Sequence, residues 1–209
     1  MFGDGSLTFR EFAVRERVPL ATIHDAVLEF LRGRNDAALF GAQAVNAYVD
    51  QPRMTQDVDI LSTRAEELAG ELRTYLHERF HLAVRVRAVA QGIGYRLYQL
   101  RKPKNRHLAD VRSVEELPAC NRLRKVLILT PPELIGQKLL SMIGRSKTPK
   151  GLIDAADLRR LLLKFPELKA GEGAVAQALR KVDAPPEALA AWRALVAEEI
   201  LPEDEDAGF

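Results

Sequence analysis

The stretch that decides the fold is residues 39–61, which read LFGAQAVNAYVDQPRMTQDVDIL. An apolar strand is predicted to end at Phe40, and Gly41 then allows the backbone to turn tightly. A short helix is expected to begin near Ala42, followed by a second turn and a second strand. Because the N–H groups at the start of a helix can bind a phosphate, this part of the stretch predicts a phosphate contact at Gly41 and Ala42.

The second strand begins with two acidic residues, Asp57 and Asp59. Side chains two residues apart on a strand point to the same face, so both carboxylates are expected to project together while Val58 points to the other side. Two neighbouring carboxylates repel each other unless a cation lies between them. Mg²⁺ is the usual cation of such an oxygen-only site, where substrate phosphates complete its coordination. The stretch therefore predicts a site for Mg²⁺ and a nucleotide.

The spacing of these residues resembles the polymerase-β-type nucleotidyltransferase superfamily, and within it the AbiEii/MenT-like toxin nucleotidyltransferases. The family pattern is a strand, Gly-Gly or Gly-Ser, a helix, and then Arg-x-Thr-x-Asp-x-Asp. The residues that match it are Gly41, Arg53, Thr55, Asp57 and Asp59. Ala42 departs from the pattern, because it offers a backbone N–H to a phosphate but no hydroxyl. The resemblance implies that Gly41, Ala42, Arg53 and Thr55 bind the nucleotide.

The resemblance also implies a fold. We expect an α/β (α+β) protein in which a small mixed sheet flanked by helices is followed by a C-terminal helical bundle. The nucleotidyltransferase domain is expected over residues 1–129 and the helical domain over residues 130–202. An acidic, disordered tail is expected over residues 203–209.

Hydrophobic periodicity predicts the individual elements. Strands are expected over residues 37–40, 57–61, 82–89, 95–100 and 107–111. Helices are expected over residues 19–31, 64–79, 131–144, 152–165, 173–182 and 186–200, with a basic linker over 145–150. Trp192, the single tryptophan, is expected in the core of the helical domain.

A third carboxylate is implied by the resemblance, because the family completes its metal site from a strand next to the Asp-x-Asp strand. Asp110, on the strand predicted over residues 107–111, is the candidate. Asp57, Asp59 and Asp110 would then hold two Mg²⁺ ions, with an NTP as the substrate and Asp59 or Asp110 accepting the proton of the attacking hydroxyl. His107 could touch the substrate, although a structural or surface role is the expectation for it.

Lys138 lies on an otherwise apolar helix face, and a buried lysine requires a partner or a function. The resembled family has a helix with Pro-Glu-x-Leu and a later lysine, then an arginine, and then Asp-x-x-Asp-Leu. Arg145 and the segment 154–158 match the later parts, so the resemblance implies that Lys138 contacts phosphate and that Asp154 belongs to the catalytic site. The alternatives are a surface lysine and an aspartate stabilised by a helix dipole.

The family suggests that the acceptor is the 3′ end of tRNA and that the chain is a toxin neutralised by a separate antitoxin protein. A basic loop over residues 101–106 is the candidate RNA contact. Its four basic residues are Arg101, Lys102, Lys104 and Arg106. Two alternatives stay open: a non-catalytic member of the fold that binds a nucleotide or a partner, and an enzyme that nucleotidylates (AMPylates) a protein.

Composition restricts the class of protein. The 209 residues include 47% apolar and 29% charged residues, which is typical of a soluble globular protein. Neither a membrane-spanning run nor a signal peptide is expected, and the single cysteine excludes disulfides within the chain, so a cytoplasmic location is predicted. The net charge of +2 includes a strongly acidic tail, so the rest of the chain is more basic and suits a polyanionic partner.

Overall fold

The computed structural model describes residues 18–202, so the predicted acidic tail lies outside the described residues. The described chain forms two compact units. The first, which we call the sheet unit, contains residues 18–43 and 53–129, and the second, the helical unit, contains residues 44–52 and 130–202. The short segment 44–52 therefore belongs with the helices although it precedes most of the sheet in the sequence.

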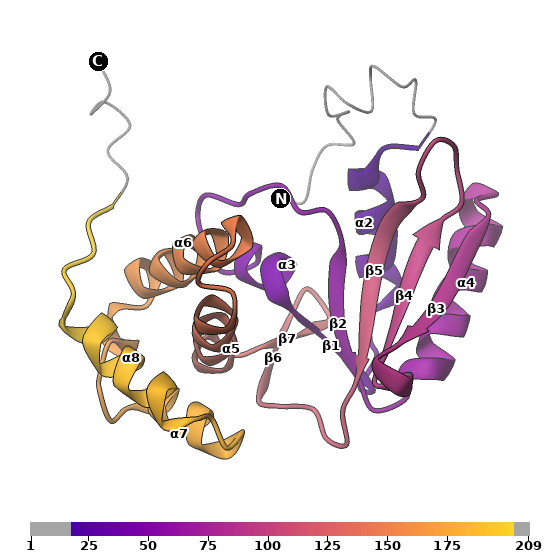
Figure 1. Cartoon of the computed structure of the whole chain (residues 1–209). Helices are drawn as coiled ribbons and strands as arrows, with labels where there is room; N and C mark the ends of the chain where they lie inside the picture. Colours follow the sequence, from indigo (N-terminus) through magenta and orange to yellow (C-terminus); the bar gives the residue numbers. More distant parts are fainter. Residues whose placement is uncertain (1–17, 203–209) are drawn as a thin grey trace, which may run out of the picture. The chain divides into compact units, whose positions relative to one another are not determined.

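The sheet unit is built on a mixed sheet of seven strands (Figure 1). The strands are β1 (Ala37–Phe40), β2 (Val58–Ser62), β3 (Val84–Val89), β4 (Gly94–Gln99), β5 (Arg106–Ser113), β6 (Cys120–Leu123) and β7 (Val126–Leu129). Their order across the sheet is β3-β4-β5-β2-β1-β7-β6. The β1–β7 and β2–β5 pairs are parallel and the others are antiparallel, which confirms the predicted mixed sheet.

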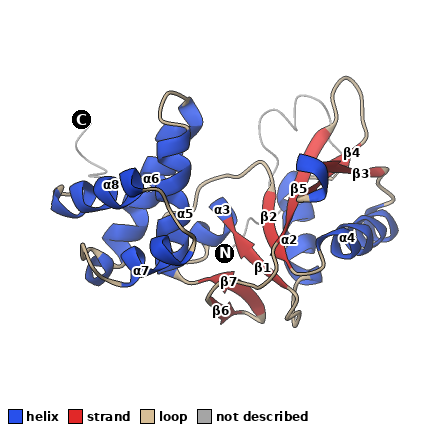
Figure 2. Ribbon diagram, turned by 60° about the horizontal axis from the view of Figure 1, so that its bottom comes forward, coloured by secondary structure: helices blue, strands red, loops and turns tan. Residues whose placement is uncertain are grey.

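Helices α2 (Leu20–Phe30) and α4 (Ala65–Phe80) pack on one face of strands β3, β4 and β5 (Figure 2). The apolar stripe of α4 faces inward as its helical spacing predicts, with Leu68, Leu72 and Leu76 fully buried. On β2, Val58 and Ile60 are also fully buried. Because alternate residues of a strand point to opposite faces, this burial directs Asp59 to the face away from the core.

Strands β6 and β7 are a correction to the sequence analysis, which predicted no strand between residues 121 and 129. They form an antiparallel hairpin in which Leu123 pairs with Val126. Its two turn residues, Arg124 and Lys125, have φ angles of 47° and 70°. A two-residue turn with positive φ usually contains Asn or Gly, and neither is present, so the normal sequence signal for a hairpin is missing.

The helical unit contains α5 (Pro131–Gly144), α6 (Pro149–Lys164), α7 (Ala174–Lys181) and α8 (Pro186–Ala197). Helix α6 begins earlier than predicted, because Thr148 caps it by accepting a hydrogen bond from the Gly151 N–H at 3.2 Å. Trp192 is fully buried, as predicted, and its Nε1 donates a hydrogen bond to the carbonyl of Ala170 at 3.1 Å.

The segment 44–52 is held to the helical unit by two contacts. Lys164 Nζ lies 2.8 Å from Asp50 Oδ1, and the rings of Tyr48 and Phe165 meet edge to face with centroids 5.8 Å apart. The short helix α3 (Gly41–Asn46) therefore starts in the sheet unit and ends in the helical unit. Among the described helices, none combines the length and apolar character that crossing a bilayer requires.

Candidate active site

The turn at Gly41 is shaped by the side chain of Asp59. Gly41 has a φ of +67°, which is unfavourable for residues with a side chain, and a Cβ built there would lie 2.0 Å from Asp59 Oδ2. Any larger residue would collide with the carboxylate. The glycine thus lets the start of α3 approach the acidic end of β2 closely.

Two of the predicted acidic residues are neighbours across parallel strands. Asp59 on β2 is in register with Asp110 on β5, so the two side chains leave the same face of the sheet side by side. Asp57 lies just before β2, which begins at Val58 rather than at Asp57 as predicted. All three carboxylates are partly accessible to solvent.

A β-bulge in β5 turns a histidine toward these carboxylates. Along β4 and β5, Leu97 pairs with Ala109 but the next residue, Tyr98, pairs with His107, so β5 contains one extra residue. Without it, His107 and Asp110, three residues apart, would face opposite sides of the sheet. The adjacent residues Leu108 and Ala109 are both fully buried, which fits this change of face.

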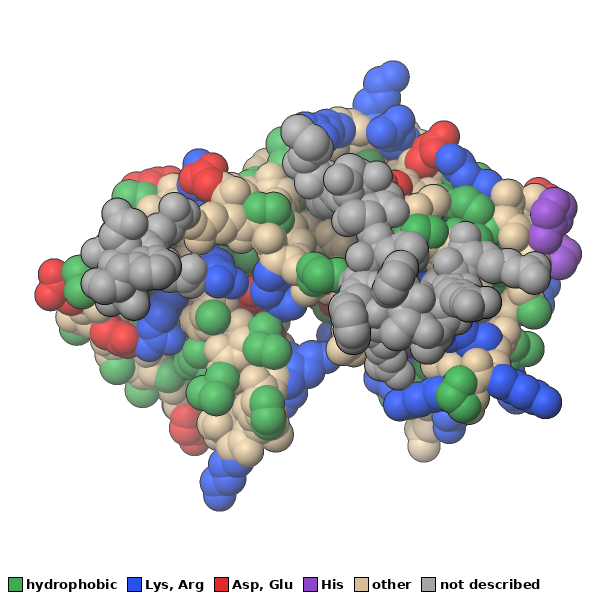
Figure 3. All heavy atoms as spheres, turned by 90° about the horizontal axis from the view of Figure 1, so that it is seen from above, with side chains coloured by type: hydrophobic (Ala, Val, Ile, Leu, Met, Phe, Trp, Pro, Cys, Tyr) green, Lys and Arg blue, Asp and Glu red, His purple; other side chains and the backbone are tan. Residues whose placement is uncertain are grey.

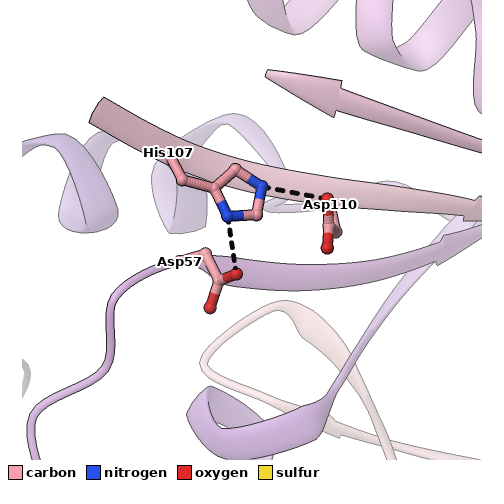
Figure 4. Close-up of side chains that lie close together, drawn as sticks. All are labelled: Asp57, His107 and Asp110. Atoms are coloured by element: carbon pink, nitrogen blue, oxygen red, sulfur yellow. Dashed lines mark hydrogen bonds and ion pairs between the residues drawn. The ribbon is translucent and has the colours of Figure 1, made fainter. Parts of the chain in front are cut away.

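His107 lies between two of the predicted metal ligands (Figure 4). Its Nδ1 is 2.9 Å from Asp57 Oδ2 and its Nε2 is 2.9 Å from Asp110 Oδ1. Ionised carboxylates only accept hydrogen bonds, so both ring nitrogens must carry hydrogen and the ring is an imidazolium. Arg96 on β4 adds a second positive group, with Nε 3.2 Å from Asp110 Oδ1.

The electrostatic balance at His107 follows from these contacts. Partial burial lowers the pKa of the imidazole, but the hydrogen bonds and charges of Asp110 and Asp57 outweigh it and raise the pKa to about 10.

Among the described residues, Asp57, His107 and Asp110 also form the group whose side chains could hold a metal ion. Asp59 is not in that group, which differs from the predicted trio of aspartates.

Thr55 is fixed by a residue that the sequence analysis did not single out. Gln43, on α3 two residues after Gly41, donates a hydrogen bond from Nε2 to Thr55 Oγ1 at 2.8 Å, and the same nitrogen lies 3.2 Å from His24 Nδ1. Gln43 and His24 are both buried. This contact joins α3 to the segment that leads to Asp57.

Arg53 in the same segment is partly exposed and donates from Nη1 to the carbonyl of Met54.

Lys138 and Asp154 meet each other inside the helical unit. Lys138 Nζ on α5 donates to Asp154 Oδ1 at 3.0 Å and to Asp157 Oδ2 at 2.7 Å, both on α6, and Arg145 Nη2 lies 2.7 Å from Asp154 Oδ2. Lys138 is 6% exposed and Asp157 1% exposed. The buried lysine therefore has carboxylate partners, and its predicted phosphate contact stays a prediction.

The four basic residues of the loop 101–106 differ in their exposure to solvent, which the sequence analysis did not expect. Lys102 and Lys104 are exposed, and Arg101 is half-buried. Arg106 is a correction: it is 8% exposed and opens β5, and its guanidinium donates to Gln99 Oε1 at 2.8 Å and to the carbonyl of Val18 at 3.0 Å. A side chain held in this way supports the sheet and is not available as a surface contact for RNA.

Two residues of the site, His107 and Gln43, had weak signals in the sequence. The two consecutive apolar residues between His107 and Asp110 interrupt the alternation of the strand, which is the pattern that a bulge produces. Gln43 follows Gly41 closely within the motif, but a polar residue on a short helix is more often exposed. Only the fold shows that it is buried against Thr55.

The pairing of His107 predicts how stability depends on pH. Its pKa is raised from 6.5 to about 10, so the stabilisation by the imidazolium is complete below about pH 6.5 and is lost as the pH rises toward 10. The difference in free energy of unfolding between the wild type and His107→Gln should therefore be largest at acidic pH and shrink at alkaline pH. Urea unfolding of both proteins at several pH values between about 6.5 and 10 measures this difference, and NMR titration of the His107 ring measures the pKa itself. A difference in free energy of unfolding that grows with pH would contradict the prediction.

The ion pair of Lys138 predicts a structural penalty. Lys138→Met leaves Asp154 and Asp157 buried next to each other without their shared cation, and should lower the free energy of unfolding by about 3–5 kcal/mol. Lys150→Met, at an exposed position of the same unit, is the matched control and should change it by less than about 0.5 kcal/mol. Urea unfolding followed by Trp192 fluorescence measures both, and equal effects would show that the ion pair is not required.

Comparisons with known proteins agree with the fold. No protein-family model matches the sequence, and no curated protein matches it significantly. Among solved structures, the Megavirus polyadenylate synthase is similar with a TM-score of 0.58 and 13% identity over 75% of this chain. The comparison covers 34% of that protein, so this chain spans about a third of its length.

Two further structures are similar. JHP933 from Helicobacter pylori has a TM-score of 0.55 and 15% identity over 94% of this chain and 84% of its own. An antigenic nucleotidyltransferase-like protein from Paracoccidioides brasiliensis has 19% identity over 90% of this chain and 94% of its own, but its TM-score of 0.45 is too low to carry an argument. The predicted nucleotidyltransferase-type α/β fold is confirmed, whereas the AbiEii/MenT-like resemblance stays a prediction.

Proposed function

We propose that the protein is a metal-dependent nucleotidyltransferase that transfers NMP from an NTP to a hydroxyl group of an acceptor. A bond forms between the acceptor oxygen and the α-phosphorus, the bond between the α- and β-phosphates breaks, and pyrophosphate leaves. The hydroxyl proton passes to a carboxylate, for which Asp59 and Asp110 are the candidates. The observation that carries this proposal is the close packing of Asp59 on Gly41, with Asp110 in register beside Asp59, in a fold of the nucleotidyltransferase type.

The carboxylates suit a divalent cation. Asp57 and Asp110 already have a positive group between them, because the imidazolium of His107 contacts both. Their oxygens are ligands that Mg²⁺ accepts, and Asp59 can contribute another from the neighbouring position. Bound Mg²⁺, with two ions expected, would neutralise the triphosphate and lower the pKa of the attacking hydroxyl. His107 must move or lose its proton for a cation to contact both Asp57 and Asp110.

The nucleotide would be bound by the turn and the segment before β2. The backbone N–H groups of Gly41 and Ala42 are candidates for the phosphates, together with the side chains of Arg53 and Thr55. Because the Thr55 oxygen accepts a hydrogen bond from Gln43, its own hydrogen can be donated to a phosphate oxygen. Lys138 and Asp154 stay candidates from the helical unit, although a phosphate contact by Lys138 requires that its bonds to the carboxylates be exchanged.

The acceptor and the biological role are a finer part of the proposal. The motif in residues 39–61 supports a toxin that modifies the 3′ end of tRNA in the cytoplasm and is neutralised by an antitoxin protein. Lys102 and Lys104 are exposed and remain candidate RNA contacts, with Arg101 beside them. Lys and Arg side chains stand out from several parts of the surface in Figure 3, so the basic loop is one of several surfaces that a polyanion could contact.

The activity is tested by incubating the protein with Mg²⁺, total tRNA and each α-³²P-labelled NTP in turn, and separating the products on a denaturing gel. Label on RNA is expected with at least one NTP. Asp59→Ala should reduce the labelling by at least about 100-fold, because it removes a proposed Mg²⁺ ligand and a candidate acceptor of the hydroxyl proton. Glu116→Ala, an exposed acidic residue of the same unit, is the matched control and should leave the labelling unchanged.

Each other outcome points to a named alternative. Full labelling by a folded Asp59→Ala variant would contradict the site assignment. Label on a protein band would favour the protein-nucleotidylating enzyme. Nucleotide binding without any labelled product would favour the non-catalytic member of the fold.

Cation binding can be tested without turnover. Mg²⁺ bound to Asp57 and Asp110 repels the imidazolium and removes its hydrogen-bond acceptors, so the pKa of His107 should fall from about 10 when Mg²⁺ is added. NMR titration of the His107 ring with and without MgCl₂ measures this shift. The ring resonances of His81, an exposed histidine of the same unit, should not move when MgCl₂ is added at constant pH. An unchanged His107 pKa at saturating Mg²⁺ would argue against a cation at these carboxylates.

A further inference from the structure

The sheet face that carries the acidic site continues to the edge strand β3. Cross-strand partners leave a sheet on the same side, so the register connects the side chains of four strands. One row contains Arg87 on β3, Arg96 on β4, Asp110 on β5 and Asp59 on β2. Since neighbouring strands are about 4.8 Å apart, this row is about 14 Å long.

A second row runs beside the first. It contains Arg85 on β3, Tyr98 on β4 and His107 on β5. The rings of Tyr98 and His107 are stacked, with centroids 5.0 Å apart and an interplanar angle of 29°. Arg112 lies two residues beyond Asp110 on the same face of β5, and it is exposed. Helices α2 and α4 pack on the opposite face of these strands (Figures 1 and 2).

The arginines nearest the edge are available for a partner. Arg85 and Arg87 are exposed, and the side chain of neither forms an ion pair or a hydrogen bond with another residue in the described range 18–202. Arg96 is also exposed, and its contact with Asp110 balances one of the negative charges in its row. Positive charge therefore increases along the face from β2 to β3.

Charged residues on an edge strand can simply prevent sheets from pairing edge to edge. That role requires charge on β3 alone. Here the arginines continue inward onto β4 and β5, at Arg96 and Arg112, where no sheet edge is exposed, and an aromatic pair lies among them. Arginines combined with an aromatic platform on an open sheet are typical of surfaces that bind single-stranded nucleic acids.

We propose that this face, defined by Arg85, Arg87, Arg96 and Tyr98, binds a single-stranded nucleic acid segment. Arg85 and Arg87 contact its phosphates, and Tyr98 stacks with a base. The 3′ end of the segment then lies toward Asp59 and Asp110, where its hydroxyl could attack the NTP. The position of the 3′ end rests on the proposed nucleotidyltransferase function, whereas the binding itself does not.

The binding is tested by fluorescence anisotropy with a short, 5′-fluorescein-labelled, single-stranded oligoribonucleotide, without NTP and without Mg²⁺, over 50–200 mM salt. The double variant R85Q/R87Q removes two phosphate contacts. It should reduce the slope of log K against log salt by about 1.4 and weaken binding about tenfold or more at 50 mM salt. The matched control R32Q/R73Q removes two exposed arginines on the opposite side of the sheet: Arg32 just follows α2, and Arg73 lies on α4. This control should bind the oligoribonucleotide like the wild type.

Three results would overturn the inference. The first is an equal loss of affinity and slope in both double variants, because then only total charge matters. The second is a wild-type protein that does not bind the oligoribonucleotide. The third is an unchanged slope in R85Q/R87Q. None of these results depends on turnover, so they are distinguishable from a failure of the labelling assay, which tests the proposed nucleotidyltransferase function alone.

Discussion

The carboxylate of Asp59 lies against the backbone of Gly41, and the rest of the site depends on this contact. A side chain at residue 41 would need the space that the Asp59 oxygen occupies, and the positive φ angle also requires glycine. The contact brings the start of α3 to the acidic end of β2, and the parallel pairing of β2 with β5 then sets Asp110 beside Asp59. The turn that we propose to bind phosphate and the group of carboxylates are thereby held next to each other on one frame.

Carboxylates brought together in this way need a positive partner. In the sheet unit the partner is His107, which reaches both Asp57 and Asp110 because of the extra residue in β5. An imidazolium can lose its proton or rotate away, so its place can be taken by another cation. The site thus combines carboxylates with a positive group that can lose its charge. Arg96, on the neighbouring strand, contributes a positive charge that does not titrate in the same range.

In the helical unit, two neighbouring carboxylates are neutralised by a lysine instead of a histidine. Asp154 and Asp157 share Lys138 in a buried position, and Arg145 contacts Asp154 from the end of α5. A buried pair of this kind is costly to disrupt, because a charge would be left without a partner in a region of low polarity. We therefore interpret the Lys138 group as a structural ion-pair cluster between α5 and α6, with any contact to phosphate as an additional role.

The sequence by itself determined the elements whose signal is local. The glycine after the first strand, the alternation at Asp57 and Asp59, and the apolar stripes of α4 and α5 depend on spacing of two or nearly four residues, which the chain shows directly. The choice of Asp110 as a neighbour of Asp59 followed from the family resemblance, and the β2–β5 register puts the two side by side.

Only the tertiary structure decided the remaining features of the site and the sheet. His107 depends on a bulge that changes the face of β5, Arg106 is buried by its bonds to Gln99 and the backbone of Val18, and the β6–β7 hairpin turns through Arg124 and Lys125. The bulge and the burial of Arg106 depend on how β5 pairs with β4 and packs on Val18, and the hairpin turn lacks the Asn or Gly that usually marks it, so the residue types alone give at most a weak signal for these features.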